Sequence, residues 1–273
     1  MNYAERNPAP PLSSYIERLW YYDSLDLPHS RERVLPDGGF ELIINLQDVP
    51  RKLFNRHDPT RYDLFHRGWM SGAHWQHLVI DVLRGSSMIG AHFRPGGAAP
   101  FMGMPADELA SKVVDLEAVW GSAAWSLRDR LLETRTATGK LSLLEAALRK
   151  RFKQTQHDHS RRGRLAIAVK QLDASPSRVP LICQELGISQ KHFIEQFRAE
   201  VGLTPKRFSR IRRFQKALAQ IGSKSEVDWS DVAFECGYYD QSHFINDFQA
   251  FCGVSPSVYL GQRLDYPNFT RAD

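Results

Sequence analysis

Cysteine is scarce in this chain of 273 residues, which contains three cysteines and none before Cys183. A small, odd number of cysteines argues against a disulfide framework and is typical of a reducing cytosol. No apolar run reaches the ~18 residues that a membrane-spanning helix needs, and residues 1–20 lack the basic start and apolar core of a secretory signal. These absences predict a cytoplasmic protein that does not insert into a membrane.

Several motifs of common enzymes are missing as well. The sequence has no G-x-S-x-G of hydrolases, no H-E-x-x-H of zinc peptidases and no G-x-x-x-x-G-K-[ST] phosphate-binding loop. A cupin-like metal centre needs a His-x-His group followed by a carboxylate and a further histidine, and residues 1–152 contain no His-x-His. We therefore expect no catalytic residues, no cofactor and no bound metal.

Net charge is only slightly biased. The chain carries +5, and residues 153–273 account for most of this, with 17 Lys or Arg against 13 Asp or Glu. So small an excess is weak evidence for a nucleic-acid partner. The local pattern is stronger, because six basic residues fall within residues 206–216 without an acidic one: Lys206, Arg207, Arg210, Arg212, Arg213 and Lys216. They form either a solvated helix face or a stripe that contacts phosphates.

The chain divides at a polar stretch over residues 156–163, which lacks an apolar period and predicts a linker. Before it, Phe40–Leu46 predicts a buried strand, and residues 78–83 and 88–93 predict two strands of a hairpin. Helical patterns begin at Pro105. This mixture predicts an α+β fold for the first part of the chain.

After the linker every pattern is helical. We therefore predict an α+β domain over residues 1–155, an all-α domain over 164–262 and a tail over 263–273. In the first domain one helical stripe is either a core face or a dimer seam, and it consists of Leu141, Leu144, Leu148 and Phe152. Four tryptophans either belong to the core or line a ligand pocket: Trp69, Trp75, Trp120 and Trp125.

The second half of the chain contains an internal repeat. Seven positions recur with the same type of residue at offsets of 50 or 51, and the offset changes once, just after a glycine. A chance match of this length is improbable, so the pattern indicates a duplicated supersecondary unit. The first copy is Cys183, Gly187, Phe193, Phe197, Gly202, Pro205 and Phe208, and the second is Ala233, Gly237, Phe244, Phe248, Gly253, Pro256 and Tyr259.

Both copies predict the same local structure. A glycine ends a first helix, an N-cap residue follows (Ser189 or Asp240), and a second helix places two phenylalanines at i and i+4 on its buried face. Thr204-Pro205 and Ser255-Pro256 then begin a further helix. Two helices around such a short turn are typical of a helix-turn-helix unit.

A helix over residues 205–221 is predicted to join the two units. Its 17 residues would extend about 26 Å at ~1.5 Å per residue. This length would hold the two second helices roughly one DNA turn, ~34 Å, apart. Both helices could then enter successive major grooves on one face of a duplex.

The second half resembles the DNA-binding domain of the AraC/XylS family of bacterial transcription regulators. The residues that carry the resemblance are Gly237-Tyr238, Phe244, Phe248 and Gly253-Val254-Ser255-Pro256-Ser257-Val258-Tyr259, and the match extends from Arg164 to Leu260. The first half resembles a less characterised N-terminal domain of such regulators. The segments that carry this second resemblance are Arg33-Val34-Leu35-Pro36-Asp37-Gly38 and Phe93-Arg94-Pro95-Gly96-Gly97.

The resemblance implies that early exposed positions of each second helix read base edges. Gln and Asn can pair with adenine, Lys can donate to guanine, and Ile can touch a thymine methyl group. The implied readers are Gln190, Lys191, Ile194 and Glu195 in the first unit and Gln241, Ser242, Ile245 and Asn246 in the second. The expected phosphate contacts are Arg198, Lys206, Arg207, Arg210 and Arg212. Two acidic residues on these helices, Glu195 and Asp247, either accept from cytosine or pair with a basic neighbour such as Arg198.

These observations predict a one-component transcription regulator with double-stranded DNA as its partner. A small-molecule effector of the first domain, a second copy of the chain and RNA polymerase are further candidate partners, and the sequence does not define the effector. One alternative is a non-specific architectural DNA binder, for which the positive charge is low. Another is an enzyme domain tethered to DNA, for which residues 1–155 offer no catalytic constellation.

Overall fold

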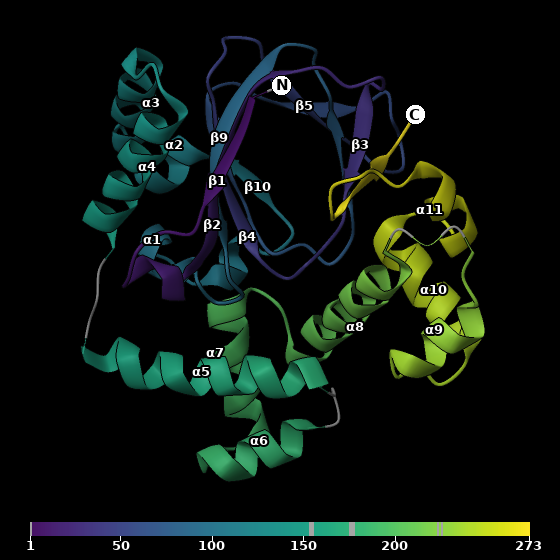
Figure 1. Cartoon of the computed structure of the whole chain (residues 1–273). Coiled ribbons are helices and arrows are strands. Elements are labelled where there is room, and N and C mark those ends of the chain that lie inside the picture. Colours follow the sequence, from purple (N-terminus) through teal and green to yellow (C-terminus); the bar gives the residue numbers. More distant parts are fainter. Residues whose placement is uncertain (1, 153–155, 175–177, 223, 225) are drawn as a thin grey trace.

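A β-rich first half and a helical second half pack against each other in this protein (Figure 1). The computed structural model describes residues 2–152, 156–174, 178–222, 224 and 226–273. The two sheets fill the upper part of Figure 1, and the helices of the second half lie below them and along the right-hand side. The predicted fold class, α+β followed by all-α with two helix-turn-helix units, is confirmed.

The first sheet has six strands, each antiparallel to its neighbours. Their order is β1 (Asn2–Arg6), β2 (Ile16–Leu25), β9 (Ser86–Phe93), β4 (Phe40–Asn45), β7 (Gly68–Ser71) and β10 (Val113–Asp115). Strand β9 lies in the middle, between β2 and β4, and all of its residues are buried. The strands predicted over Phe40–Leu46 and residues 88–93 are therefore present as β4 and β9.

The second sheet has five strands and includes residues from the far end of the chain. Its order is β11 (Phe269–Arg271), β3 (Arg31–Val34), β8 (Leu78–Asp81), β5 (Arg51–Phe54) and β6 (Tyr62–Phe65), again with antiparallel neighbours. The edge strand β11 lies within the predicted tail, residues 263–273. Part of that tail thus completes a sheet of the first domain.

The predicted hairpin between residues 78–83 and 88–93 is wrong. Strand β8 pairs with β3 and β5, whereas β9 pairs with β2 and β4 in the other sheet. The connection between them is still a tight turn, in which Gly85 has φ 74° and its N–H donates to the Leu25 carbonyl (2.6 Å). Turn residues in the sequence predict a reversal of the chain, but they do not show whether the two flanking strands pair with each other or belong to different sheets. Strand pairing depends on which distant strands pack beside β9.

Short helices cover the first sheet. They are α1 (Ala99–Met102), α2 (Leu116–Trp120), α3 (Ala123–Glu133) and α4 (Ala137–Arg151), with 3₁₀ turns at Leu12–Ser14 and Ala106–Leu109. On α4, Leu141, Leu144 and Leu148 are buried, and the Phe152 ring packs edge-on against Tyr15 at 4.8 Å. The stripe is therefore a core face, and the dimer seam is excluded as its role because its leucines are already covered.

The helical half contains the predicted elements with close to their predicted bounds. It consists of α5 (Gln156–Ala174), α6 (Val179–Leu186), α7 (Gln190–Val201), α8 (Pro205–Ile221), α9 (Trp229–Glu235), α10 (Gln241–Cys252) and α11 (Pro256–Gln262). The joining helix α8 has the bounds expected from the sequence. Residues 156–163 differ from the expected linker, because α5 begins at Gln156 and continues into the buried stripe of Leu165, Ala168 and Leu172.

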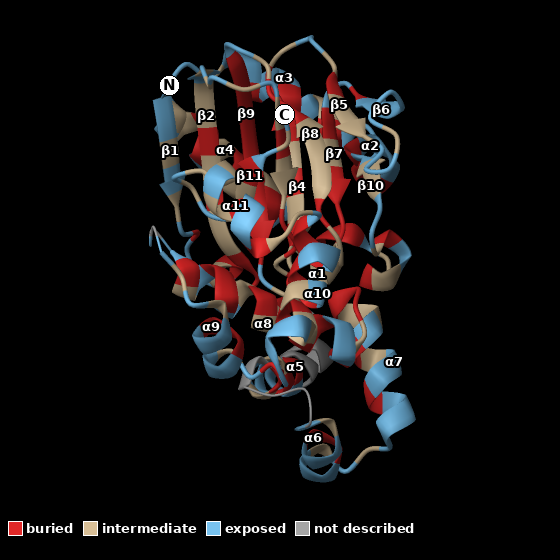
Figure 2. Cartoon of the chain, turned by 90° about the vertical axis from the view of Figure 1, so that its right-hand side faces the viewer, coloured by how far each residue is buried: buried red, intermediate tan, exposed pale blue. Residues whose placement is uncertain are grey.

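One continuous core links the two halves. A single cluster of buried apolar side chains includes Phe40 and Phe93 of the first sheet together with Phe208 and Phe214 of α8. Figure 2 shows buried positions both in the sheets and in the helices packed beneath them. The two domains thus form an extensive, partly apolar junction, and this junction determines which residues of the helical half remain exposed.

Candidate nucleic-acid interface

Helices α6 and α7 form the first helix-turn-helix unit, as the repeat predicts. Helix α6 ends at Gly187, whose φ of 64° is in the left-handed region that favours glycine. The Ser189 hydroxyl oxygen accepts a hydrogen bond from the His192 N–H (3.2 Å) and caps α7. The glycine and the cap together fix where the exposed start of α7 lies.

Helices α9 and α10 form the second unit in the same way. The turn contains Gly237 at φ 75°, and Asp240 Oδ1 accepts from the His243 N–H (2.7 Å) to cap α10. The helices that follow each unit are capped alike, α8 by Thr204 and α11 by Ser255. All four N-caps expected from the sequence are therefore confirmed.

The repeated aromatic residues make equivalent contacts in the two units. Phe197 of α7 packs edge-on against Phe208 of α8 with ring centroids 5.5 Å apart. Phe248 of α10 packs in the same manner against Tyr259 of α11 at 5.4 Å. Edge-to-face packing of this kind stabilises aromatic pairs beyond their buried area. It holds each second helix to the helix that follows it.

The sequence-predicted base readers lie at the starts of α7 and α10, and most of them are exposed. Gln190, Lys191, Ile194 and Glu195 on α7 and Gln241, Ser242 and Asn246 on α10 are exposed, whereas Ile245 is half-buried. The Gln241 side-chain oxygen accepts from the Ser230 hydroxyl (3.1 Å), which leaves its amide N–H groups available for a base edge.

Asp247 does not read bases in this structure. The residue is 4% exposed, and its carboxylate forms ion pairs with Arg210 (2.6 Å) and Arg213 (3.4 Å) on α8. Of the two roles considered for this acidic residue, the structure supports internal pairing. Glu195 differs, because it is exposed on α7. The acidic charge of α10 thus serves the packing of α10 on α8.

Three of the five expected phosphate contacts are engaged with the first domain, and Arg210 pairs with Asp247. Lys206, the fifth, is exposed at the start of α8. The interdomain contacts join Arg198 Nε to Asp107 Oδ2 (3.1 Å), the Arg207 guanidinium to the face of the Trp75 ring (4.6 Å) and Arg212 Nη1 to the Asp37 carbonyl oxygen (3.5 Å). The first domain therefore holds side chains that a DNA backbone would also attract.

The two sequence segments that carry the N-terminal resemblance both lie at this junction. The Gln215 side-chain N–H of α8 donates to the Pro36 carbonyl (2.8 Å). Gly38 has φ 88°, and a Cβ there would lie 3.1 Å from the Phe208 ring. Gly96 has φ 72°, and a Cβ there would lie 2.3 Å from the Leu165 side chain. Glycine is required at both positions by the backbone conformation and by the close approach of the second domain.

A polar cavity of about 150 Å³ lies where the first sheet, α8 and the C-terminal tail meet. Strand β2 contributes two consecutive residues to its lining, Glu17 and Arg18, at a point where the pairing register with β9 shifts. A β-bulge of this kind can turn neighbouring side chains toward the same face. The other charged and amide side chains of the lining are Asp37, His92, Arg212, Gln215 and Asn268.

His92 is a buried charge at the wall of this cavity. Its Nε2 lies 3.2 Å from Asp37 Oδ2, and its Nδ1 lies 2.5 Å from Glu41 Oε2. Burial disfavours the protonated ring, but the two carboxylates outweigh that effect and raise the pKa of His92 to about 9. The ring is therefore an imidazolium at neutral pH, and it ties β9 to β4 and to the loop that contacts α8.

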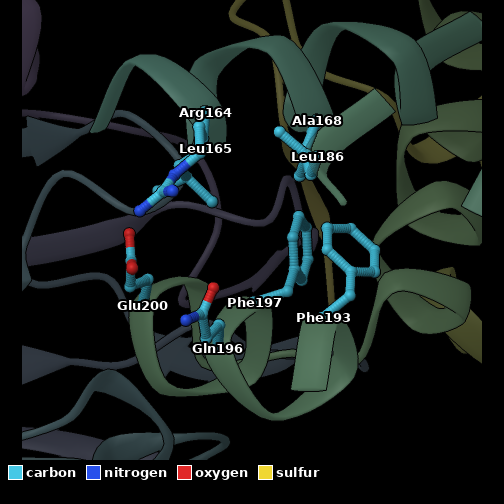
Figure 3. Close-up of a pocket in the computed structure, with 8 residues that line it drawn as sticks. All are labelled: Arg164, Leu165, Ala168, Leu186, Phe193, Gln196, Phe197 and Glu200. Carbon is cyan, nitrogen blue, oxygen red and sulfur yellow. The ribbon is translucent and has the colours of Figure 1, made fainter. Parts of the chain in front are cut away.

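A second hollow, between α5 and α7, is too small for a ligand (Figure 3). It encloses about 20 Å³, room for roughly one water molecule. Figure 3 shows Phe193 and Phe197 of α7 beneath Leu186 and Ala168. This hollow is a gap in the packing of the first helix-turn-helix unit, and it leaves the cavity at the domain junction as the better candidate for a ligand.

The sequence predicts that the cysteines are buried structural thiols, and Cys183 and Cys252 are buried whereas Cys236 is half-buried. All three cysteines are free thiols, and burial raises the pKa of Cys252 to about 12. Within the ranges that the structure describes, no cluster of three or more His, Cys, Asp or Glu side chains could hold a metal ion. The cysteines are packing residues, as the sequence indicates.

Two exposed aromatic residues were missed by the sequence analysis. Phe234 on α9 is 84% exposed, and Tyr239 in the turn before α10 is 92% exposed. Large aromatic side chains at such exposure on a helix-turn-helix unit are available for contact with a partner. In the sequence, Tyr239 directly follows the Gly237-Tyr238 pair that carries the resemblance. Whether the Tyr239 side chain is exposed depends on how α9 and α10 cross, which the sequence does not show.

Comparison with known protein families assigns a type to each half of the chain. Residues 182–262 match a family described as a helix-turn-helix domain. Residues 4–115 match a family described as a domain of unknown function. No helix within the described ranges is long and apolar enough to cross a bilayer.

Two curated relatives are similar to part of the chain. An uncharacterised HTH-type transcriptional regulator of Haemophilus influenzae is 29% identical over 93 residues, which make up 34% of this chain and 31% of that one. The HTH-type transcriptional activator RhaS of Escherichia coli is 29% identical over 75 residues, which make up 28% and 27% of the two chains. The chain thus spans about a third or less of the length of these relatives.

Solved structures of ToxT from Vibrio cholerae are distantly similar over most of the chain. One of them has a TM-score of 0.45 and 12% identity, and the match covers 96% of this chain and 98% of that one. A second, bound to an unsaturated fatty acid, has a TM-score of 0.45 and 11% identity, with 94% of each chain covered.

Proposed function

We propose that the chain is an AraC-type transcription regulator that binds specific DNA sequences in the cytoplasm and controls transcription there, because residues 182–262 match a helix-turn-helix family and two HTH-type regulators are 29% identical to part of the chain. The observation that carries the proposal is the pair of N-capped helices α7 and α10, whose exposed first turns bear the side chains implied as base readers. RNA polymerase and a second copy of the chain are further proposed partners.

Recognition combines contacts to bases with contacts to phosphates. On α7, Gln190 and Lys191 can donate to adenine and guanine, and on α10 Asn246 can pair with adenine. The expected phosphate contacts are Arg198 on α7 and Lys206, Arg207, Arg210 and Arg212 on α8, and they would supply the sequence-independent part of the affinity. The 17 residues of α8, about 26 Å long at ~1.5 Å per residue, are proposed to hold the two second helices roughly one DNA turn apart.

The first domain is proposed to sense a small molecule through the cavity at the domain junction. Its lining carries charges of both signs, so the occupant we propose is a small hydrophilic molecule rather than an apolar one. The cavity is bordered by His92 and Asp37 of the first domain and by Arg212 and Gln215 of α8. A ligand that contacts both sides would favour one domain arrangement over another and so change DNA affinity.

The test of this proposal is selection of random duplex DNA by the full chain, followed by sequencing. We expect one asymmetric motif with two blocks about 10–10.5 bp apart. Flat enrichment across sequences, with binding that merely weakens as salt rises, would favour the architectural DNA binder instead. Sustained catalytic turnover by the protein would favour the tethered enzyme.

Two variants separate base reading from phosphate contact. Asn246→Ala should relax the motif at one position of one block and weaken binding to the selected site by ~1–3 kcal/mol. Lys206→Ala should weaken binding to all sequences alike and reduce the slope of log K against log salt by about 0.9. Identical effects of the two variants on selected and random duplexes would contradict the assigned roles.

A further inference from the structure

The last residues of the chain return from the helical half to the first domain (Figure 1). After α11 ends at Gln262, β11 lies antiparallel to β3, with Phe269 opposite Val34 and Arg271 opposite Glu32. Strand β11 is the outermost strand of its sheet. A segment that follows the DNA-binding domain in sequence is therefore a structural part of the first domain.

Further hydrogen bonds fasten this segment at both ends and on both domains. The Thr270 side chain is fully buried, and its hydroxyl donates to the carbonyl of Gln262 (2.9 Å), which ties β11 to α11. The bonds to the first domain run from the Leu35 N–H to Asn268 O (2.8 Å), from the Ala272 N–H to Arg31 O (3.1 Å), and from the Ser30 N–H and hydroxyl to Asp273 Oδ2 (2.7 Å each).

The arrangement held by this segment is the one in which three expected phosphate contacts are engaged elsewhere. Arg198, Arg207 and Arg212 touch Asp107, Trp75 and the Asp37 carbonyl of the first domain. A guanidinium that remains on a carboxylate, a ring face or a carbonyl cannot at the same time give its full set of donors to a phosphate. Tight DNA binding and the closed domain junction therefore compete for the same side chains.

We propose that residues 263–273 are an intramolecular clasp that holds the DNA-binding domain closed on the first domain in a form of low DNA affinity. Pairing of β11 with β3 must break before all three arginines reach the DNA backbone. The inference rests on the proposed function, because DNA is the ligand that favours the open form. The small-molecule cavity adjoins the clasp through Asn268, so an effector there would act on the same equilibrium.

The clasp is built to open reversibly. Strand β11 has three residues and lies at the sheet edge, where an isolated bridge between Thr270 and Arg263 forms on the side away from β3. Short terminal elements of this kind belong to the least stable units of a fold and open without global unfolding. A low-stability latch is what a ligand-controlled equilibrium requires, since the closed and open forms must differ by only a few kcal/mol.

A reversible lock gives the sharpest test. The Leu35 N–H donates to the Asn268 carbonyl opposite it, so the next pair, Val34 and Phe269, is a non-hydrogen-bonded pair, where opposed Cα atoms lie about 4.5 Å apart. This separation suits a disulfide. The full-length double variant V34C/F269C is therefore oxidised or reduced, and its affinity is measured on the duplex that the unaltered chain selects.

We expect the oxidised form to bind this duplex about 5- to 150-fold more weakly than the same protein after reduction, the usual range of coupling between two sites. The unaltered chain, taken through the same oxidation and reduction, is the control. Equal affinity of the oxidised and reduced double variant would overturn the proposal.

The opposite change, release of the clasp, is made with Thr270→Pro in the full chain, because proline removes a main-chain donor from the strand and disfavours pairing. Thr270→Ser is the matched control, since it keeps both the main-chain N–H and the hydroxyl that donates to Gln262. Release should raise affinity and steepen the slope of log K against log salt by up to about 2.7, for three phosphates at ~0.9 each. Hydrogen exchange at residues 269–271 reports whether the strand has opened.

A released strand with unchanged affinity and unchanged salt slope would also overturn the proposal. Should Thr270→Pro fail to fold, a chain ending at Asn268 replaces it. A second variant, Asp107→Asn combined with Trp75→Ala, removes the first-domain partners of Arg198 and Arg207. If the unaltered chain selects no motif at all, the proposed function fails. If it selects a motif but the locked and released variants bind it equally, the clasp alone fails.

Discussion

His92 is a buried, charged residue at the domain junction. It is a buried imidazolium held between Asp37 and Glu41, and these carboxylates raise its pKa to about 9 although burial opposes the charge. Because Asp37 also offers its carbonyl to Arg212, this ring supports the loop on which α8 rests. Nothing in the sequence around His92 predicted that role, since its partners lie 51 and 55 residues away.

The His92 pair makes stability depend on pH. A pKa raised above its unfolded value of ~6.5 stabilises the folded state fully below pH ~6.5, and this contribution is lost as pH rises through about 9. We expect the unaltered chain to lose up to about 3 kcal/mol between pH 6.5 and 9.5, and His92→Gln to lose clearly less, in urea denaturation. His57→Gln, at an exposed histidine, is the control, and an equal loss in His92→Gln would contradict this assignment.

At the scale of secondary-structure elements, the sequence was most informative about the N-caps of helices. Ser189, Thr204, Asp240 and Ser255 each accept a main-chain N–H in the first turn of the helix they precede. Capping depends on residues within one helical turn of each other, so it can be recognised without knowledge of the tertiary structure. Pairing of strands depends on distant residues, which explains why the hairpin predicted for β8 and β9 was wrong.

The cap of α10 should matter for both stability and DNA binding. Asp240→Ala removes the acceptor for the His243 N–H and should destabilise the protein by about 0.5–2 kcal/mol, with weaker binding to the selected duplex because the first turn of α10 frays. Asp240→Asn should restore most of the stability, since asparagine caps nearly as well. Equal losses for both variants in thermal denaturation would show that charge, not capping, is the relevant property.

The whole molecule is organised around a junction between its two domains. The buried cluster crosses from the sheets into α8, the two segments with the N-terminal resemblance face the helical half, and β11 returns to the second sheet of the first domain. The first domain therefore covers part of the DNA-binding half. Its own helix α4 is turned inward, which leaves its leucine stripe no role in association between copies.

The burial of that stripe can be checked directly. Leu144 is fully buried on α4, so Leu144→Ala should destabilise the first domain by about 2–5 kcal/mol without a change in oligomeric state. Leu132→Ala, at a leucine that is 45% exposed on α3, should have little effect. Urea denaturation and sedimentation velocity provide the two measurements. A change in association with unchanged stability would identify the stripe as a seam after all.

The amino-acid sequence by itself determined the features that depend on near neighbours. The duplicated unit, the bounds of α8, the caps and the left-handed glycines all follow from spacings within about one unit of the repeat. The exposed positions of α7 and α10 follow from the same periodicity, because a helix that buries its phenylalanines must turn its other face outward.

Only the tertiary structure decided which of those exposed groups are already engaged. The sequence does not distinguish three basic side chains of the helical domain, Arg198, Arg207 and Arg212. In the structure each contacts a different segment of the first domain. The strand formed by residues 269–271 is equally invisible in the sequence. A strand of three residues carries no usable periodicity, and it exists because β3 offers it an edge.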